Sequence, residues 1–174
     1  LYAALNRTST PMGARRLRDW LSQPLSSVEA IRRRQEALGQ FIHNSPALDR
    51  FRESLQEVRD LERTISRLSI GSGNARDLVQ LRGALDRLPL LRGLIADAQS
   101  GVDPIAPTLS EEIFDDAEPD GLPPLLSELG GELHELPEVT DLISRAIVDD
   151  PPMALKDGGI IRKGFDPALD ELRS

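Results

Sequence analysis

Apolar residues recur every three or four positions along most of this chain, which is the spacing of one face of an α-helix. The clearest case is residues 11–23, where two leucines and Trp20 share one face. Trp20 is the only tryptophan of the chain. We therefore expect it to be mostly buried and to organise a core, packed against leucines of two later helices at residues 28–44 and 75–88.

The helix predicted at residues 28–44 carries a second apolar pattern. Its members alternate three and four positions apart: Val28, Ile31, Gln35, Leu38 and Ile42. This spacing is typical of a stripe that packs against another helix. Similar spacing predicts helices over residues 48–68, 75–88 and 137–148, and in the last of these Leu142, Ile143 and Ala146 are expected to face inward.

Glycine and acidic residues near the end of the chain predict a change of structure there. Gly158 and Gly159 suit the turn of a short β-hairpin within residues 154–163. Gly164 permits a left-handed backbone, and Asp166 is placed to cap a helix. The predicted fold class is therefore mainly α, with one short β-hairpin.

Composition limits the class of protein. The chain has 174 residues, 39% of them hydrophobic but only 3% aromatic, so the core must be aliphatic. It has no cysteine, which excludes disulfides and thiolate metal sites. No apolar run approaches the length of a membrane span, and no signal peptide is recognisable. The chain opens on an apolar segment and stops inside an expected helix, so we interpret it as part of a longer protein.

The charge is divided unevenly. The net charge is −8, but residues 1–100 hold 16 arginines and 11 acids, a net of +5, whereas residues 101–174 hold 5 bases and 18 acids, a net of −13. A basic half raises the hypothesis of nucleic-acid binding. Over residues 49–63, however, the arginines alternate with acids at helical spacing, which favours a solvated, ion-paired surface.

Residues 101–131 differ from the rest because they combine five prolines with a run of acids. The segment Asp116-x-Glu118-x-Asp120-Gly121 is superficially similar to a calcium loop. An EF-hand requires glutamate at its twelfth position, which is Ser127 here. The better interpretation is an acidic, proline-rich loop between helices.

No catalytic, cofactor-binding or metal-ligating residues are predicted. The glycines at 71 and 73 lack the third glycine of a dinucleotide loop, because position 76 is arginine. No Gly-Lys-Ser or Gly-Lys-Thr phosphate loop occurs in the chain. His43 and His134 are isolated, so neither a metal site nor a catalytic triad can be argued.

Several segments together resemble the core, or lever, domain of the bacterial MutS family of DNA mismatch-recognition ATPases. The similar segments are RTSTPMGARRLRDWLSQPL at 7–25, IRRRQ at 31–35, DLERTISRL at 60–68, NARDL at 74–78, and IVDDPPMALKDGGIIRKGFDPALDELR at 147–173. Ala75 stands where the family pattern usually has proline. The acidic segment at 101–131 is the part to which the resemblance transfers least.

The resemblance implies one core (lever) domain fragment over residues 1–174, with residues 166–174 as the root of a lever helix. In the family this domain joins the ATPase domain to helices that carry the DNA clamp. The expected function is therefore structural and allosteric transmission in DNA mismatch repair. The fragment itself is not expected to be an enzyme or to hold a cofactor.

For a full-length protein the resemblance implies ATP and Mg²⁺ as cofactors, a bacterial cytoplasmic location, no membrane and a homodimer. The implied partners are the ATPase, clamp and connector domains, mismatched duplex DNA and MutL. Structural or interdomain roles are expected for Trp20, Asp60, Glu62, Arg63, Gly158, Gly159, Gly164 and Asp166. For Glu62 and Arg63 a plain surface ion pair is slightly preferred over an interdomain network. The alternatives are the same core in a MutS-like recombination protein, or an unrelated all-α scaffold.

Overall fold

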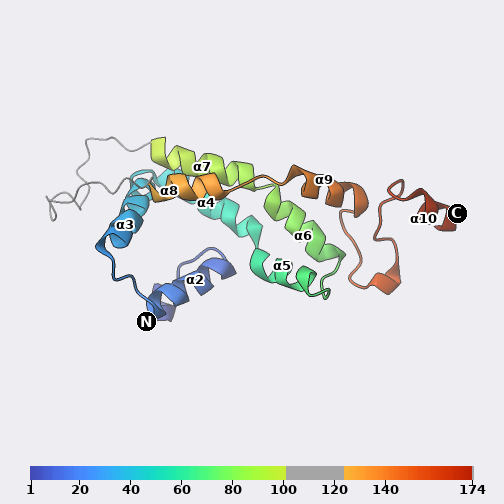
Figure 1. The fold of residues 1–174 in the computed structure, drawn as a ribbon, viewed down its shortest axis with the longest axis horizontal. Coiled ribbons are helices and arrows are strands. Elements are labelled where there is room, and N and C mark those ends of the chain that lie inside the picture. The colour runs from blue at the N-terminus through green and yellow to red at the C-terminus, as the bar shows by residue number, and fades with distance from the viewer. Residues whose placement is uncertain (101–123, 174) are drawn as a thin grey trace. The chain divides into compact units, whose positions relative to one another are not determined.

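The computed structural model describes residues 1–100 and 124–173, and within them the chain is mainly helical, as predicted (Figure 1). The α-helices are α1 (Tyr2–Leu5), α2 (Pro11–Ser22), α3 (Val28–His43), α4 (Ser45–Val58), α5 (Leu61–Ser69), α6 (Ala75–Leu85), α7 (Leu88–Ser100), α8 (Leu125–Glu132), α9 (Pro137–Ala146) and α10 (Pro167–Arg173). A short 3₁₀ helix, η1, spans Leu155–Asp157. Among the described residues, no helix is long and apolar enough to cross a lipid bilayer.

Side-chain caps fix where several helices begin. The Thr10 hydroxyl accepts a hydrogen bond from the Gly13 amide at 3.0 Å, and Pro11 follows in the first turn of α2, where its missing N–H costs nothing. The Ser27 side chain caps α3 by accepting a hydrogen bond from the Ala30 amide. Asp166 caps α10 as predicted, because its carboxylate accepts from the Ala168 and Leu169 amides at 3.0 and 3.3 Å.

Two helix boundaries differ from the prediction. The helix expected over 48–68 is divided into α4 and α5 at Arg59, which adopts the left-handed φ of 58°. The helix expected over 75–88 ends at Leu85, and Leu88 begins α7 instead. Pro89 therefore lies in the first turn of α7, where proline is tolerated, rather than after the end of a helix.

The described chain forms two compact units. The first contains the described residues of Leu1–Gln56 and Leu88–His134, and in it α3, α7 and α8 pack together. One buried cluster among its described residues contains Ala47, Ile95, Ala98 and Leu126, and Phe41 and Phe51 pack against it with ring centroids 5.2 Å apart. The alanines allow the helix backbones to approach closely, and the rings fill the remaining volume.

The presence of α8 corrects the prediction of a loop over residues 101–131. Residues 101–123 lie outside the described residues, but Leu125–Glu132 are helical. Leu126 is buried in the core of the first unit, and Gly130 is buried beside Ile95. The prediction gave weight to the polar, proline-rich start of the segment, whereas the segment's end is helical because it buries an apolar side chain on one face.

The prediction that Trp20 is mostly buried is wrong. Trp20 is 44% exposed, and the Arg34 guanidinium of α3 lies 3.9 Å from the centre of its ring. The contact is a cation–π interaction at the surface, not packing in a leucine core. Helical spacing correctly placed Trp20 on one face of α2, but the described residues leave nearly half of its side chain exposed instead of covering it with leucines.

The second unit contains Glu57–Arg87 together with the described residues from Glu135 onward. In it α6 packs against α5 on one side and α9 on the other. One buried cluster contains Ala75, Ile143 and Ile147, with half-buried aliphatic residues of α6 around them, and Val58, Ala84 and Leu85 are buried as well. Ile143 is buried as predicted, but Leu142 is 50% exposed, so the expectation that it faces inward is wrong.

The predicted β-hairpin near residues 154–163 is not present. Residues 155–157 form η1 instead, and the partner of Ile161 is Ile147, in a single isolated antiparallel bridge. The Val148 amide donates to the Ile160 carbonyl at 3.0 Å, and the Arg162 amide donates to the Ala146 carbonyl at 2.8 Å. The glycines do turn the chain, but the extended segment after them pairs with the end of α9 because Ile147 is part of the buried core.

Candidate functional site

Helix α6 carries the polar network of the second unit, and its first turn holds the most buried charge. Asp77 is 5% exposed. The carboxylate accepts from the Asn74 amide at 3.0 Å, while the Asn74 side chain accepts from the Asp77 amide at 3.1 Å, which completes a capping box. Arg67 of α5 donates to both carboxylate oxygens, through Nη2 to Oδ1 and through Nε to Oδ2 at 3.3 Å. Arg67 also donates to the buried Thr64 hydroxyl.

The contact between Arg67 and Asp77 shifts the pKa of each side chain in the direction that favours its charged form. The hydrogen bonds from Arg67 lower the pKa of the Asp77 carboxyl, with a further contribution from the Asn74 amide, although burial opposes them. The same contact raises the pKa of Arg67 above its ordinary value. Asp77 therefore remains ionised and joins α5 to α6.

On the other side of α6, Asp149 lies between two arginines. Its Oδ1 is 3.1 Å from Arg162 and 3.2 Å from Arg82. These hydrogen bonds lower the pKa of the Asp149 carboxyl, with Arg162 making the larger contribution. Arg162 also donates to the carbonyls of Ser144 and Ile147, so one side chain ties the segment after the glycines to the end of α9. Because Asp149 is largely exposed, water screens the pairs and their effect is on orientation more than on stability.

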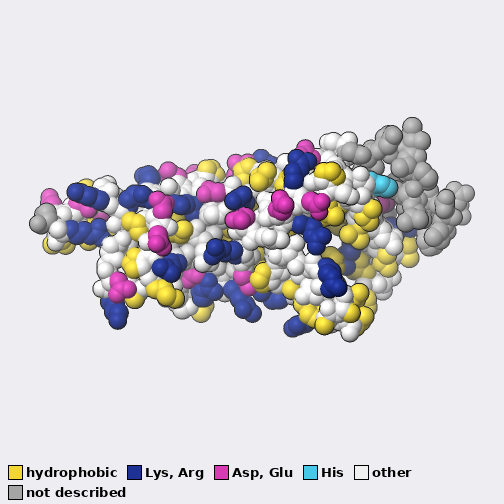
Figure 2. Space-filling view, turned by 180° about the vertical axis from the view of Figure 1, so that it is seen from behind, with side chains coloured by type: hydrophobic (Ala, Val, Ile, Leu, Met, Phe, Trp, Pro, Cys, Tyr) yellow, Lys and Arg dark blue, Asp and Glu magenta, His cyan; other side chains and the backbone are white. Residues whose placement is uncertain are grey.

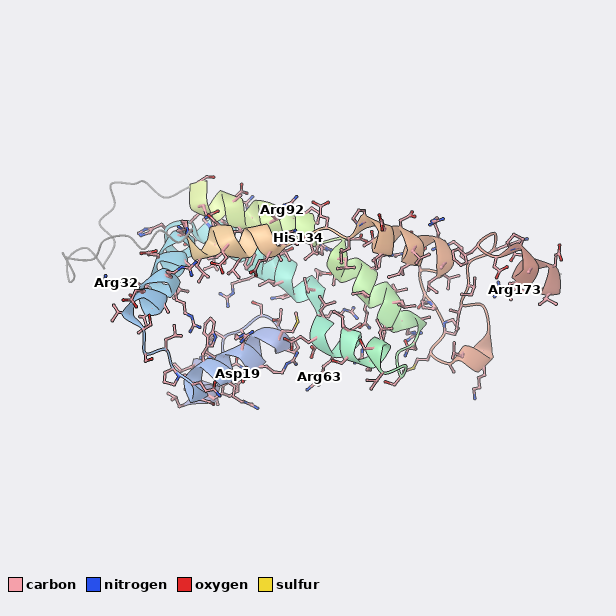
Figure 3. The ribbon with its side chains drawn as sticks, in the orientation of Figure 1. Asp19, Arg32, Arg63, Arg92, His134 and Arg173 are labelled. Atoms are coloured by element: carbon pink, nitrogen blue, oxygen red, sulfur yellow. The ribbon has the colours of Figure 1, made fainter. Side chains whose placement is uncertain are left out.

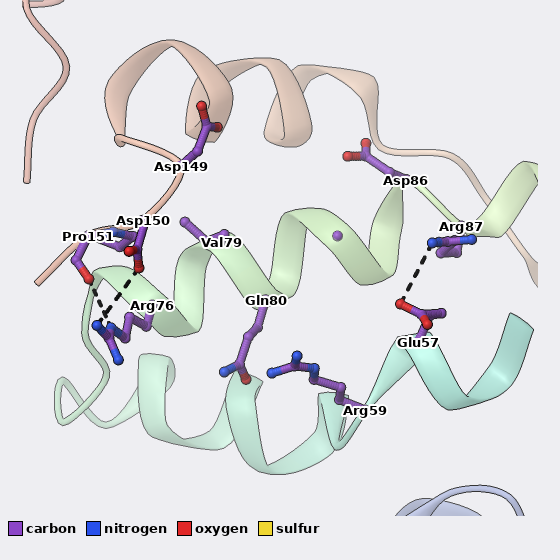
Figure 4. A pocket seen from close by; sticks show the side chains of 11 residues that line it. Glu57, Arg59, Arg76, Val79, Gln80, Asp86, Arg87, Asp149, Asp150 and Pro151 are labelled. Atoms are coloured by element: carbon purple, nitrogen blue, oxygen red, sulfur yellow. Dashed lines mark hydrogen bonds and ion pairs between the residues drawn. The ribbon is translucent and has the colours of Figure 1, made fainter. Parts of the chain in front are cut away.

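A polar pocket of about 590 Å³ lies along α6 (Figure 4). Two contacts join residues that line it: Arg76 Nε donates to the Pro151 carbonyl at 2.8 Å, and Arg87 Nη2 lies 3.7 Å from Glu57 Oε2. The other lining residues are Arg59, Val79, Gln80, Gly83, Asp86, Asp149 and Asp150. Arginines and carboxylates alternate around it, so the pocket has no single charge that would attract a polyanion.

The residues expected at an interdomain network lie at the start of α5. Asp60 caps the helix by accepting from the Arg63 amide at 3.4 Å, and Arg63 Nε lies 3.5 Å from Asp60 Oδ2. The Arg63 side chain is 72% exposed and projects from the outer side of α5 (Figure 3). Glu62 is also exposed. Asp60 and Arg63 are therefore brought together, as a cap and a surface pair.

The predicted glycines adopt the backbone that requires them. Gly158 and Gly159 each have φ of 69°, and Gly164 has φ of 89°, conformations that other L-residues rarely adopt. The Gly164 amide donates to the Asp170 carboxylate of α10 at 2.7 Å, which ties the start of that helix to the preceding turn. These residues and Asp166 belong to the second unit, whereas Trp20 belongs to the first.

Sequence reasoning missed the central pair, Arg67 and Asp77, and the Asp149 bridge. All three residues lie inside segments that resemble family motifs: Arg67 in DLERTISRL, Asp77 in NARDL and Asp149 in IVDDPP. The sequence therefore held one signal for the central pair: one motif contains an arginine and another an aspartate, which can form an ion pair. Which acid meets which base depends on the packing of α5, α6 and α9, and spacing along the chain does not reveal it.

The arrangement is suited to holding helices together. Within residues 1–100 and 124–173, no cluster of three or more histidine or acidic side chains is arranged to bind a metal ion. Asp77 and Asp149, whose carboxyl pKa values are lowered, are each already paired with arginines. The fold and site thus define a helical domain whose buried and bridging ion pairs fix the relation of α6 to its neighbours.

Comparison with known proteins identifies the family. The sequence profile of MutS domain III matches residues 1–172, so the chain belongs to the MutS domain III family. It is 40% identical over 173 residues to the DNA mismatch repair protein MutS of Symbiobacterium thermophilum, 39% identical to that of Trichormus variabilis and 39% identical to that of Myxococcus xanthus. These alignments cover 99%, 100% and 99% of this chain but only 17%, 18% and 17% of the relatives. The chain thus spans about one sixth of their length.

Proposed function

We propose that this chain is the core (lever) domain of a DNA mismatch-recognition ATPase, which transmits the nucleotide state of an ATPase domain to a DNA-gripping clamp. The observation that carries the proposal is the match to MutS domain III over residues 1–172. On this proposal residues 1–174 act as one domain fragment, and α10, which begins after Asp166, is the root of a lever helix. The role of the fragment is mechanical rather than catalytic.

The second unit has the construction that such a role requires. A body that transmits a displacement must keep its own helices in register. Buried Asp77 joins α5 to α6, and Asp149 joins α6 to the segment that leads toward α10 through Arg82 and Arg162. Gly164 then fixes the start of α10 through Asp170. A continuous series of contacts therefore supports movement of α6 and the root of the lever together.

For the full-length protein we propose ATP with Mg²⁺ as cofactors and a homodimer in the bacterial cytoplasm. The proposed partners are mismatched duplex DNA, MutL, and the connector, clamp and ATPase domains. None of these groups is assigned a site on the fragment. For Asp60, Glu62 and Arg63 we propose that the side chains at the start of α5, of which those of Glu62 and Arg63 are exposed, take part in contacts with such domains. Gly158, Gly159, Gly164 and Asp166 are proposed to shape the approach to the lever.

A test of transmission uses a full-length MutS protein that carries this chain as its domain III. Asp149→Ala removes the acceptor shared by Arg82 and Arg162 without touching the buried core. We expect slower ATP-induced release from mismatched duplex, with unchanged ATP hydrolysis in the absence of DNA. Asp141→Ala is the matched control, because the pair that Asp141 forms with Arg145 on α9, at 2.8 Å, is exposed. Equal release rates for both variants and the parent would refute the proposed transmission.

The isolated chain provides two further tests. We expect no ATP hydrolysis, because its sequence has no phosphate loop. We expect at most weak, salt-sensitive binding to duplex DNA and no preference for a mismatch, because the net charge of −8 opposes a polyanion. Turnover that follows the folded chain through purification, or tight mismatch-selective binding, would contradict this assignment. Full-length protein that releases matched and mismatched duplex alike would instead favour the recombination branch or an unrelated scaffold.

A further inference from the structure

Helix α3 presents two apolar faces, and the described residues of the first unit cover only one of them. Ala37 and Phe41 pack against the core formed with α7 and α8. The other face carries Val28, Ile31, Leu38 and Ile42, which are 49%, 38%, 60% and 68% exposed. We call this set, with exposed Gln35 at its centre, the α3 stripe. It is the pattern whose spacing predicts a helix partner, yet no described helix of the first unit covers it.

The spacing of the α3 stripe defines the shape of what covers it. Successive members are three, four, three and four positions apart, so they keep to one line along α3 for its whole length. A seam with this average period of 3.5 residues matches the side-chain rows of a second α-helix, in which knobs enter the holes between stripe residues. An extended peptide would meet alternate residues instead and would not match.

One edge of the α3 stripe is formed by α2. Arg34 lies next to Ile31 and Leu38 on the surface of α3, because side chains three and four positions apart are neighbours on a helix. The Arg34 guanidinium in turn lies 3.9 Å from the centre of the Trp20 ring. Trp20 is 44% exposed, so its outer side is available to a helix that lies on the stripe. As the single tryptophan of the chain, it also reports the arrival of that helix.

The charges around the α3 stripe select among possible occupants. Residues 11–43 hold six arginines and three acids, and one of these arginines, Arg33, already pairs with Glu128 of α8. Figure 2 shows apolar and basic side chains lying side by side over the region of α2 and α3. A helix with acidic flanks complements this surface, whereas a second copy of α3 would bring arginines against arginines.

We propose that the α3 stripe and Trp20 together bind an acidic, amphipathic α-helix supplied from outside residues 1–174. The helix lies along α3, places its apolar residues over Ile31, Leu38 and Ile42, and directs its acids toward the arginines on either side. This inference goes beyond the proposed transmission role and does not depend on it, because it concerns what the first unit binds.

The test uses the 174-residue chain and a synthetic helical peptide on the order of three heptads long, with leucine at the a and d positions and glutamate at the flanking positions. The like charges of the glutamates also prevent the peptide from pairing with itself. The peptide lacks tryptophan, so all emission comes from Trp20. Binding is expected to shift that emission to the blue and to reduce its quenching by acrylamide.

Two variants and two peptides decide the outcome. Leu38→Asp, at an exposed stripe position, is expected to weaken binding at least tenfold while leaving the far-UV circular dichroism unchanged. Leu90→Asp, at a 48% exposed position on α7, is the matched control and is expected to bind like the parent. A peptide of scrambled sequence and one with lysine in place of glutamate are expected not to bind.

The proposal is overturned if the acidic peptide does not bind, if the scrambled or lysine peptide binds equally well, or if Leu38→Asp has no effect. Sedimentation of the chain alone tests the remaining occupant. Concentration-dependent dimers that disappear in Leu38→Asp would show that a second copy covers the stripe, and this result would also overturn the proposal.

Discussion

Replacement of Asp77 by alanine tests whether the polar network around α6 holds the second unit together. The substitution removes the reciprocal cap with Asn74, which contributes about 1 kcal/mol. It also removes charge-assisted hydrogen bonds from Arg67, and such bonds to a buried group contribute about 1.5–3 kcal/mol. The Arg67 side chain is 42% exposed, so water solvates its charge after the carboxylate is lost, and the larger penalty of a fully buried orphan charge does not apply.

The expected loss of unfolding free energy for Asp77→Ala is therefore about 2.5–4 kcal/mol. Urea unfolding followed by far-UV circular dichroism measures it. With a denaturant dependence of about 2 kcal/mol per molar, the midpoint should fall by about 1–2 M. Asp77→Asn keeps an acceptor for the cap but lacks the charge, so its midpoint should lie between those of Asp77→Ala and the parent.

The matched control is Asp141→Ala, which removes the exposed pair with Arg145 on α9 of the same unit. Its midpoint should equal that of the parent, because both partners are well solvated. If Asp77→Ala also leaves the midpoint unchanged, then the capping box and the Arg67 contact contribute no net stability. The argument that α6 is fixed by its ion pairs would then fail.

Three more predictions concern the same unit. The pKa of the Asp77 carboxyl is lowered in the folded state, so the stability that its charge contributes is complete above the ordinary aspartate pKa of about 3.9 and is lost as the pH falls through the lower folded pKa. The difference in urea midpoint between the parent and Asp77→Asn should therefore shrink in acid. A difference that does not depend on pH would contradict the lowered pKa. Arg59→Gly should be more stable than Arg59→Ala by about 1 kcal/mol in thermal unfolding, because position 59 has a φ of 58°; equal stability of the two would argue against backbone strain there. Gly73→Ala should lower the free energy of unfolding by about 1–3 kcal/mol, because a Cβ at position 73 would lie 3.0 Å from the Leu68 Cα. A Cβ at position 83 meets nothing within 4 Å, so Gly83→Ala should raise the free energy of unfolding by about 0.5–1 kcal/mol. The reverse order of the two variants in urea unfolding would refute this packing.

The sequence predicted most helices because helix formation and burial leave the same periodic signal. The boundaries of α2, α3, α9 and α10 agree with the apolar spacing and the capping residues to within a few positions. The division at Arg59 left no such signal, since arginine and its neighbours are ordinary helix formers. Helix α7 was missed because the helix predicted over residues 75–88 ended just before Pro89, although proline suits the first turn of a following helix equally well.

Periodicity is less informative about what covers a face. It identified the row that contains Trp20 and the α3 stripe, but their exposure depends on whether another element lies against them. For the same reason the sequence contains the motifs that form the site but does not predict which of their residues pair. Arg67 and Asp77 were both within recognised motifs, yet the contact between them exists only because α5 and α6 pack side by side.

The way the chain is divided between its two units has a consequence for its synthesis. Each unit is assembled from two separated stretches, and the chain passes between the units after Gln56, Arg87 and His134. In the first unit Ala47 packs with Leu126, and in the second Ala75 packs with Ile147. A nascent chain that has emerged only as far as α6 therefore contains neither finished core, and both must wait for distant partners to be translated. Neither unit can be excised as one continuous stretch, and truncation at any point before α9 leaves the second unit without the side chains that close it.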